Sequence, residues 1–149
     1  MDGKDAHDAI WSPDGFQILF ASGRGDNNKL YVMDFNGREP GLVNHTIDTR
    51  GRSDWSLDDL FAFDMGGTFQ HDVYLLNLDG SKLHMISKGN NSHGASFSPD
   101  GQWIALTAYT DVANKDTASC EIYTMRVDGS DTRQLTSKHY CDYQPRWGN

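Results

Sequence analysis

Apolar residues occur along this chain in short runs, and polar turns rich in glycine, proline and aspartate separate the runs. Three segments repeat one order: an aromatic residue, a Ser-Pro-Asp-Gly-like turn, two apolar runs, an Asn-Gly or Asp-Gly pair and a short closing run. The aromatic residues Trp11, Trp55 and Phe97 are 44 and 42 residues apart. A period of roughly 40–45 residues that contains four short strands is typical of β-propeller blades.

The turn chemistry agrees with this interpretation. Ser12-Pro13-Asp14-Gly15 matches a type I turn, because serine, proline and glycine occupy the positions that they favour there. Hairpin signals follow in each repeat at Asn36-Gly37, Asp79-Gly80 and Asp128-Gly129. The runs are rich in β-branched and aromatic residues and show no sustained helical period. We therefore expect an all-β fold of four-stranded antiparallel blades. The second repeat has Leu57 and Asp59 in place of proline and glycine, which predicts a looser first turn.

The repeats define one partial propeller unit over residues 1–149. Its predicted blades cover about 7–48, 50–90 and 92–138, and the third contains extra residues at 110–119. A spare inner strand is expected at 140–149, because Tyr143 to Trp147 aligns with the start of the first repeat. The aromatic anchors of the repeats are expected in the cores between blades: Trp11, Trp55, Phe97 and Trp147.

The repeat resembles that of the TolB-type propeller family. Five segments carry the resemblance: Trp11 to Gly15, Tyr31 to Asp34, Ser98 to Gly101, Ile122 to Met125 and Leu135-Thr136. It implies a non-enzymatic scaffold for protein or peptide partners, with a role in periplasmic translocation or envelope function and a periplasmic or otherwise extracytoplasmic location. Similar repeats occur in peptidase propellers and in a few lyases, so the fold alone does not fix the function.

Three blades are too few for a closed propeller, which needs four to eight. An open fan would leave two apolar blade faces uncovered. We therefore expect a homodimer that closes a six-bladed ring, with the segment from Tyr143 to Trp147 at the junction.

The starts of the inner strands predict a polar channel mouth. Positions three and four residues before the anchors supply His7, Asp8, Arg52, His93 and Tyr143. Ligands of propellers usually bind where strand ends from several blades converge. This mouth could hold a metal, an anion or a peptide, or its residues could simply be solvated at the strand entry.

A rival prediction from another class is a metal-dependent lyase or hydrolase that uses the mouth histidines. The sequence contains no G-x-S-x-G, H-E-x-x-H or P-loop pattern, and we expect a non-enzymatic protein without a cofactor. Acidic turns at 26–28 and 111–116 lack the ordered spacing of a calcium loop, so a divalent metal stays an open alternative.

Charge and cysteine content limit the partners and the compartment. The net charge is -8, which opposes binding to nucleic acid or to anionic lipid, and no apolar run is long enough to span a membrane. Cys120 and Cys141 do not form a zinc pattern. They are either disulfide-bonded or buried as free thiols. The N-terminus lacks an apolar secretory stretch and starts close to the first repeat, which indicates a processed or truncated chain.

Overall fold

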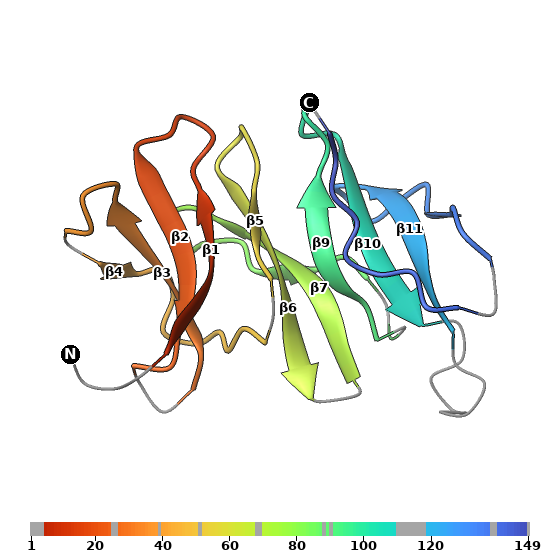
Figure 1. Ribbon diagram of the computed structural model, residues 1–149, viewed down its shortest axis with the longest axis horizontal. Coiled ribbons are helices and arrows are strands. Elements are labelled where there is room, and N and C mark those ends of the chain that lie inside the picture. The colour runs from red at the N-terminus through yellow and green to blue at the C-terminus, as the bar shows by residue number, and fades with distance from the viewer. Residues whose placement is uncertain are drawn as a thin grey trace.

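The computed structural model describes residues 5–24, 27–38, 40–50, 52–67, 70–87, 89, 91–109, 119–137 and 140–148. These residues form strands and no helix, and none of them belongs to a helix that could cross a membrane. The strands make three four-stranded sheets that stand side by side as a fan (Figure 1). The all-β prediction and the four-stranded blades are therefore confirmed.

Each sheet contains four consecutive strands in antiparallel order. The first sheet contains β1 (Ala6–Trp11), β2 (Gln17–Ser22), β3 (Lys29–Asp34) and β4 (Gly41–Leu42). The second contains β5 (Asp54–Trp55), β6 (Leu60–Gly67), β7 (Gln70–Asn77) and β8 (His84–Met85). The third contains β9 (His93–Phe97), β10 (Trp103–Tyr109), β11 (Cys120–Arg126) and β12 (Arg133–Gln134). Residues 110–118, which make up most of the predicted insertion, lie outside the described residues.

The turn after each inner strand is closed by its serine. The Ser12 hydroxyl accepts the Gln17 N–H at 2.8 Å and donates to Asp14 at 2.6 Å, which lowers the pKa of that carboxyl. The corresponding turn of the second sheet is one residue shorter, and Asp59 adopts a φ of 56°. The sequence predicted that this turn would be looser. That prediction is wrong, because the Ser56 N–H still donates to the Leu60 carbonyl at 2.9 Å.

The anchor aromatic of each sheet defines what we call its leading face, and the opposite side is its trailing face. Trp55 lies opposite Phe61 on the leading face of the second sheet, and both pack against Leu19 and Leu30 on the trailing face of the first. Phe97 of the third sheet packs in the same way against the trailing face of the second. Every leading face thus contacts the trailing face of the preceding sheet, and these contacts form the two cores.

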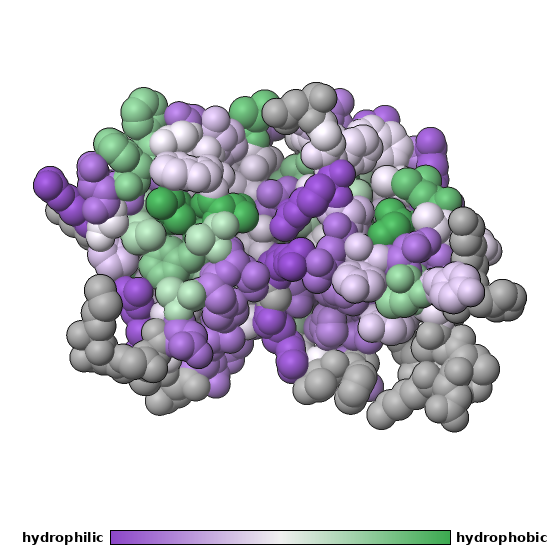
Figure 2. Space-filling model, viewed as in Figure 1, coloured by the Kyte–Doolittle hydropathy of each residue, from purple (hydrophilic) through white to green (hydrophobic). Residues whose placement is uncertain are grey.

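The leading face of the first sheet has no preceding sheet among the described residues. Trp11 lies opposite Ile18 on this face and is 59% exposed, whereas Trp55 is 7% and Phe97 6% exposed. Figure 2 shows the hydrophobic surface that gathers over the first sheet, at the left of the view. Within the described residues Trp11 therefore does not fill a core between blades as expected, because none of the three sheets covers its face.

The C-terminal segment 140–148, here called the tail, crosses in front of β9 and β10 (Figure 1). It was expected to form a spare inner strand, yet its described residues form no strand. An inner strand needs the second strand of its own blade beside it, and none of the described strands pairs with the tail. Trp147 is 39% exposed and lines a hollow with Trp55 and Phe97, which corrects its predicted place in a core.

The tail is nevertheless fixed to the third sheet. A disulfide joins Cys120 at the start of β11 to Cys141, with Cα atoms 4.4 Å apart, and the Asp142 N–H donates to the Cys120 carbonyl at 2.7 Å. The Gln144 N–H donates to the Thr107 hydroxyl on the trailing face of β10 at 3.0 Å. Of the two cysteine alternatives, the structure has the bonded form. The tail therefore lies against the face that a fourth sheet would otherwise contact.

Candidate functional site

A backbone irregularity sets the geometry where the inner strands begin. The β1–β2 register shifts between His7 and Ile10, and the β9–β10 register shifts beside Thr107. Asp8 and Gly94 each stand three residues before the anchor of their own sheet. They share a left-handed backbone, with φ angles of 53° and 66°. Such bulges bend an inner strand and turn the affected side chain out of the sheet plane. In this protein they turn that repeat position toward the channel.

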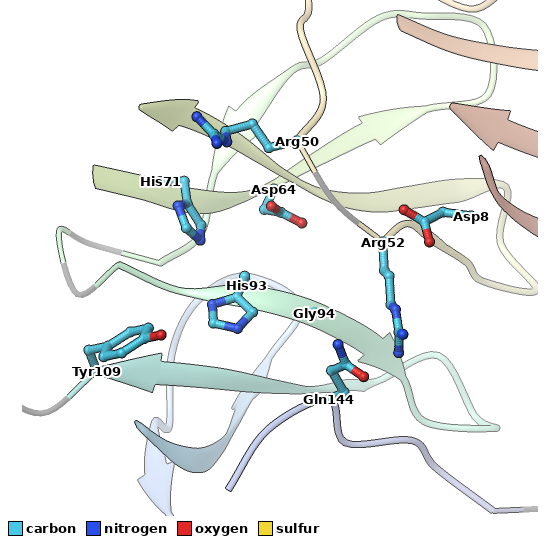
Figure 3. Close-up of a pocket in the computed structure, with 9 residues that line it drawn as sticks. All are labelled: Asp8, Arg50, Arg52, Asp64, His71, His93, Gly94, Tyr109 and Gln144. Atoms are coloured by element: carbon cyan, nitrogen blue, oxygen red, sulfur yellow. The ribbon is translucent and has the colours of Figure 1, made fainter. Parts of the chain in front are cut away.

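A hollow of about 410 Å³ lies at this end of the inner strands, and we call it the mouth hollow. All three sheets and the tail contribute to it (Figure 3). Its lining consists of Asp8, Arg50, Arg52, Asp64, His71, His93, Gly94, Tyr109 and Gln144. Nearly all of these side chains can form hydrogen bonds, and four of the nine are aspartates or arginines.

The structure brings together three of the five residues predicted for the mouth. Asp8, Arg52 and His93 line the mouth hollow. His7 is not part of the lining, but its Nδ1 lies 3.0 Å from the Asp8 carboxylate and holds that side chain. Tyr143 is also absent from the lining, and its side chain is exposed on the tail.

Five other lining side chains are not among the residues that the sequence predicted for the mouth. Arg50 precedes β5, Asp64 and His71 come from the second and third strands of the middle sheet, and Tyr109 ends β10. Asp64 was detectable in principle, since it is the one charged residue in the apolar run from Leu60 to Met65. Gln144 occupies the same repeat position as Asp8 and adopts a similar φ of 60°.

Asp64 is a carboxyl group in a nearly closed environment. Its side chain is 4% exposed, and its Oδ1 has no hydrogen-bond partner among the described residues. Burial raises the pKa of Asp64 to about 6, while the positive charges of His71 and Arg50 act in the opposite direction. A buried acceptor without a donor is costly, so this oxygen favours a ligand that brings an N–H or O–H group.

His93 lies beside Asp64 in the mouth hollow and is also incompletely paired. Its Nδ1 is buried without a hydrogen-bond partner in the described residues. Its ring lies 5.3 Å from the His71 ring and 5.9 Å from the Tyr109 ring, measured between centroids. Burial, and then the neighbouring His71, lower the pKa of His93, so its imidazole is neutral at neutral pH. A neutral imidazole can accept or donate one hydrogen bond at each nitrogen, according to its tautomer.

The cationic side of the mouth hollow comes from the segment before β5. Arg52 points toward Gln144 in Figure 3, and Arg50 lies on the other side of Asp64, next to His71. Hydrophilic side chains accordingly occupy the middle of the view in Figure 2. The hollow thus offers a guanidinium donor, a buried acceptor and a neutral imidazole, and this set suits a polar chain better than an apolar ligand.

The geometry does not strengthen the metal alternative. Within the described ranges, no three His, Cys, Asp or Glu side chains are placed to hold a metal ion. Asp26 and the acidic turn at 111–116 lie outside the described residues.

The fold and the mouth hollow define a protein of the β-propeller class. Comparison with known proteins shows which propellers it is similar to. No family model matches the sequence. An uncharacterized protein of Agrobacterium fabrum is 28% identical over 139 residues, which cover 90% of this chain and 44% of that protein. The chain therefore spans less than half the length of the curated relative that it matches.

Two solved structures are similar to the fold. The structure of a TolB candidate from Agrobacterium tumefaciens matches with a TM-score of 0.78 and 25% identity, over 94% of this chain and 49% of that one. TolB from Acinetobacter baumannii matches with a TM-score of 0.73 and 18% identity, over 91% and 33% of the two chains. These likenesses support the TolB-like propeller fold that the repeats predicted.

Proposed function

We propose that this chain forms part of a non-enzymatic, TolB-like propeller that binds a peptide or protein segment at the mouth hollow. The observation that carries the proposal is the pair of unpartnered polar atoms there, Asp64 Oδ1 and His93 Nδ1, beside the Arg52 guanidinium. A peptide backbone presents N–H donors and carbonyl acceptors in alternation. It can therefore donate to Asp64 and accept from Arg52 at the same time.

The shape of the mouth hollow supports the same ligand class. Residues from every sheet and from the tail converge on it, so an extended segment could contact several sheets at once. Its polar lining would hold the backbone of a bound segment, because main-chain hydrogen bonds supply the affinity when an extended peptide is recognised.

The proposed setting is an oxidising compartment, such as the bacterial periplasm. Its support is the disulfide between Cys120 and Cys141, because such bonds persist where thiols are not kept reduced. A role in translocation or in the cell envelope follows only by analogy with the TolB-like fold.

The test begins with phage-displayed random linear peptides selected on the 149-residue chain. Selected peptides are then labelled, and their binding to variants is followed by fluorescence anisotropy. Arg52→Glu reverses a charge in the mouth hollow and should weaken binding by about tenfold or more, which is at least about 1.4 kcal/mol. Arg38→Glu makes the same charge change on an exposed hairpin outside the hollow and should leave the affinity unchanged.

The outcome decides the proposal in either direction. Peptides that bind both arginine variants equally well, or a library that yields no binder, would contradict it. Asp64→Asn gives a second check, because it keeps the size of the side chain but replaces one acceptor oxygen by a donor group. Weaker binding to this variant, with Arg38→Glu unaffected, supports a donor on the peptide that reaches Asp64.

A further inference from the structure

A second hollow lies at the opposite end of the inner strands from the mouth hollow. Its volume is about 610 Å³, and we call it the anchor hollow because the aromatic anchors of all three sheets line it. Each inner strand runs from the mouth hollow toward its anchor, and in Figure 1 this end is at the top, where the C-terminus also lies. The end of the tail completes the lining. The anchor hollow therefore draws on the same four parts of the chain as the mouth hollow but on different residues.

Rings make up most of the apolar part of the anchor hollow. Trp11 is mostly exposed and Trp147 partly exposed, so both indoles have surface that a ligand can cover. Aromatic rings gain most from flat or ringed apolar groups that stack against them. The rings of the lining belong to Trp11, Pro13, Trp55, Phe97, Pro99 and Trp147.

The side-chain acceptors of the anchor hollow are already engaged. The Asp54 carboxylate accepts the Phe97 N–H at 2.7 Å and a hydrogen bond from Ser96, and the Arg146 guanidinium lies 3.8 Å from its other oxygen. The hydroxyls of the two lining turns are used in the same way. Ser56 accepts the Leu60 N–H at 3.0 Å, and the equivalent Ser98 accepts its own turn's N–H at 2.9 Å.

The donors of the anchor hollow, in contrast, are not all used. Trp55 is 7% exposed, and its Nε1–H is buried with no hydrogen-bond partner among the described residues. An indole can only donate, and Arg146 likewise brings donors and no acceptor. A buried donor without an acceptor is costly. The anchor hollow therefore favours a ligand that supplies acceptors without bringing donors of its own.

This requirement separates the anchor hollow from the mouth hollow and excludes other ligand classes. At the mouth the unpartnered Asp64 oxygen favours a ligand with N–H groups. At the anchor hollow such groups, or the hydroxyls of a sugar, would meet acceptors that are already engaged. A cation would meet Arg146 beside a carboxylate that this arginine already faces. A small hydrated anion would gain nothing from the rings.

We propose that the anchor hollow binds a proline-rich segment of a partner protein in the polyproline II conformation. Proline has a backbone carbonyl but no N–H, so a run of prolines offers acceptors alone. Its rings supply the apolar groups that aromatic side chains favour. The extended helix is formed before binding, and grooves lined by aromatic side chains recognise it for this reason. The proposal does not depend on peptide binding at the mouth hollow.

Nuclear magnetic resonance on the nitrogen-labelled chain, with decaproline as the probe, tests the proposal. The four tryptophans give four indole N–H signals. Decaproline should shift the signals of Trp11, Trp55 and Trp147, and that of Trp55 should move downfield as its N–H gains a carbonyl acceptor. Trp103 is the internal control, because it lies outside the anchor hollow with the Arg126 guanidinium over its ring at 4.1 Å. Its signal should stay where it is.

Two alanine variants of the tail give a matched pair. Trp147→Ala should weaken decaproline binding by about fivefold or more, the cost of truncating an aromatic anchor in an interface. Tyr143→Ala removes another exposed aromatic side chain of the tail, outside the anchor hollow, and should leave the affinity unchanged. A Gly-Ser peptide of the same length as decaproline should not bind. Far-UV circular dichroism confirms that each variant is folded.

Several results would overturn the proposal. Decaproline at millimolar concentration that shifts no indole signal, or shifts that of Trp103 as much as the others, contradicts binding in the anchor hollow. Equal losses for the two tail variants contradict it as well, and equal binding of the Gly-Ser peptide contradicts recognition of proline. A peptide selected at the mouth hollow should bind together with decaproline, and displacement would contradict a separate site. Failure of either site leaves the other standing.

Discussion

The first and second sheets carry matching side chains on their leading faces, yet their aromatic anchors lie in different environments. Trp55 of the second sheet is enclosed by the trailing face of the first, whereas Trp11 at the equivalent position is open to solvent. The repeat thus determines which way an aromatic anchor points, and the neighbouring sheet determines whether the anchor is buried. The stability that one repeat position contributes should differ accordingly between the two sheets.

Alanine substitution at the two tryptophans should give the largest difference in stability between the first and second sheets. Trp55→Ala removes a large buried side chain and should lower the free energy of unfolding by about 3–5 kcal/mol. Trp11→Ala removes an exposed one and should cost less than about 1 kcal/mol. Urea denaturation at low protein concentration, where association contributes least, measures both. Equal losses for the two variants would show that the faces have been assigned wrongly.

The third sheet extends the comparison with the first sheet, because the tail covers its trailing face. Replacing Cys120 and Cys141 by serine frees the tail and should lower the free energy of unfolding by about 2–4 kcal/mol. The freed face should then bind more of a hydrophobic dye, and the third sheet would come to resemble the exposed first sheet. Urea denaturation and dye fluorescence report the two effects. Thiol labelling of the unreduced, unfolded wild-type chain should find no free cysteine, and labelling of two thiols would refute the bond.

Substitution of Asp64, which lies on the trailing face of the second sheet, should give the smallest of the three effects on stability. The equivalent residues are Ala21 in the first sheet and Thr107 in the third, so the middle sheet alone carries a carboxyl group at this position. Its folded-state pKa of about 6 lies above the ordinary 3.8. Between these pH values the folded protein holds a proton that the unfolded chain has lost, so stability falls as the pH rises through this range.

Asp64→Asn should therefore raise the free energy of unfolding by about 1–3 kcal/mol at pH 7 and change it little at pH 4. Urea denaturation at the two pH values tests this. Asp79→Asn is the control, because hydrogen bonds from Ser81 lower the pKa of this exposed carboxyl, and its effect should have the opposite sign. A gain from Asp64→Asn that is the same at both pH values would exclude titration of Asp64 as its cause.

The spacing of residues in the sequence predicted the three sheets and the face on which each anchor lies, because both depend on residues that are close together in the chain. Turn residues fix where strands end, and the alternation along a strand fixes which face a side chain joins. The burial of Trp11 was mispredicted because burial depends on a neighbouring sheet, and none of the described sheets covers this face. The tail was mispredicted as a strand for a related reason, since a strand requires a partner with free hydrogen-bonding groups.

The mouth hollow was predictable only in part. Counting back from the anchors found Asp8, Arg52 and His93, because inner strands start at a common end. It could not find His71 or Tyr109, because these come from strands whose ends reach the mouth only after the hairpins form. The spacing of residues also does not reveal the bulge that turns Asp8 toward the mouth hollow.

The pairing of strands strictly in chain order has a consequence for how the protein is made. Every strand bonds only to strands adjacent to it in the chain, so each sheet can close as soon as its own residues have left the ribosome. The first sheet is made before the other two, and its trailing-face residues Leu19 and Leu30 stay uncovered until the leading face of the second sheet has formed. The tail is made after all three sheets, so its disulfide to Cys120 is the last link of the described unit to form.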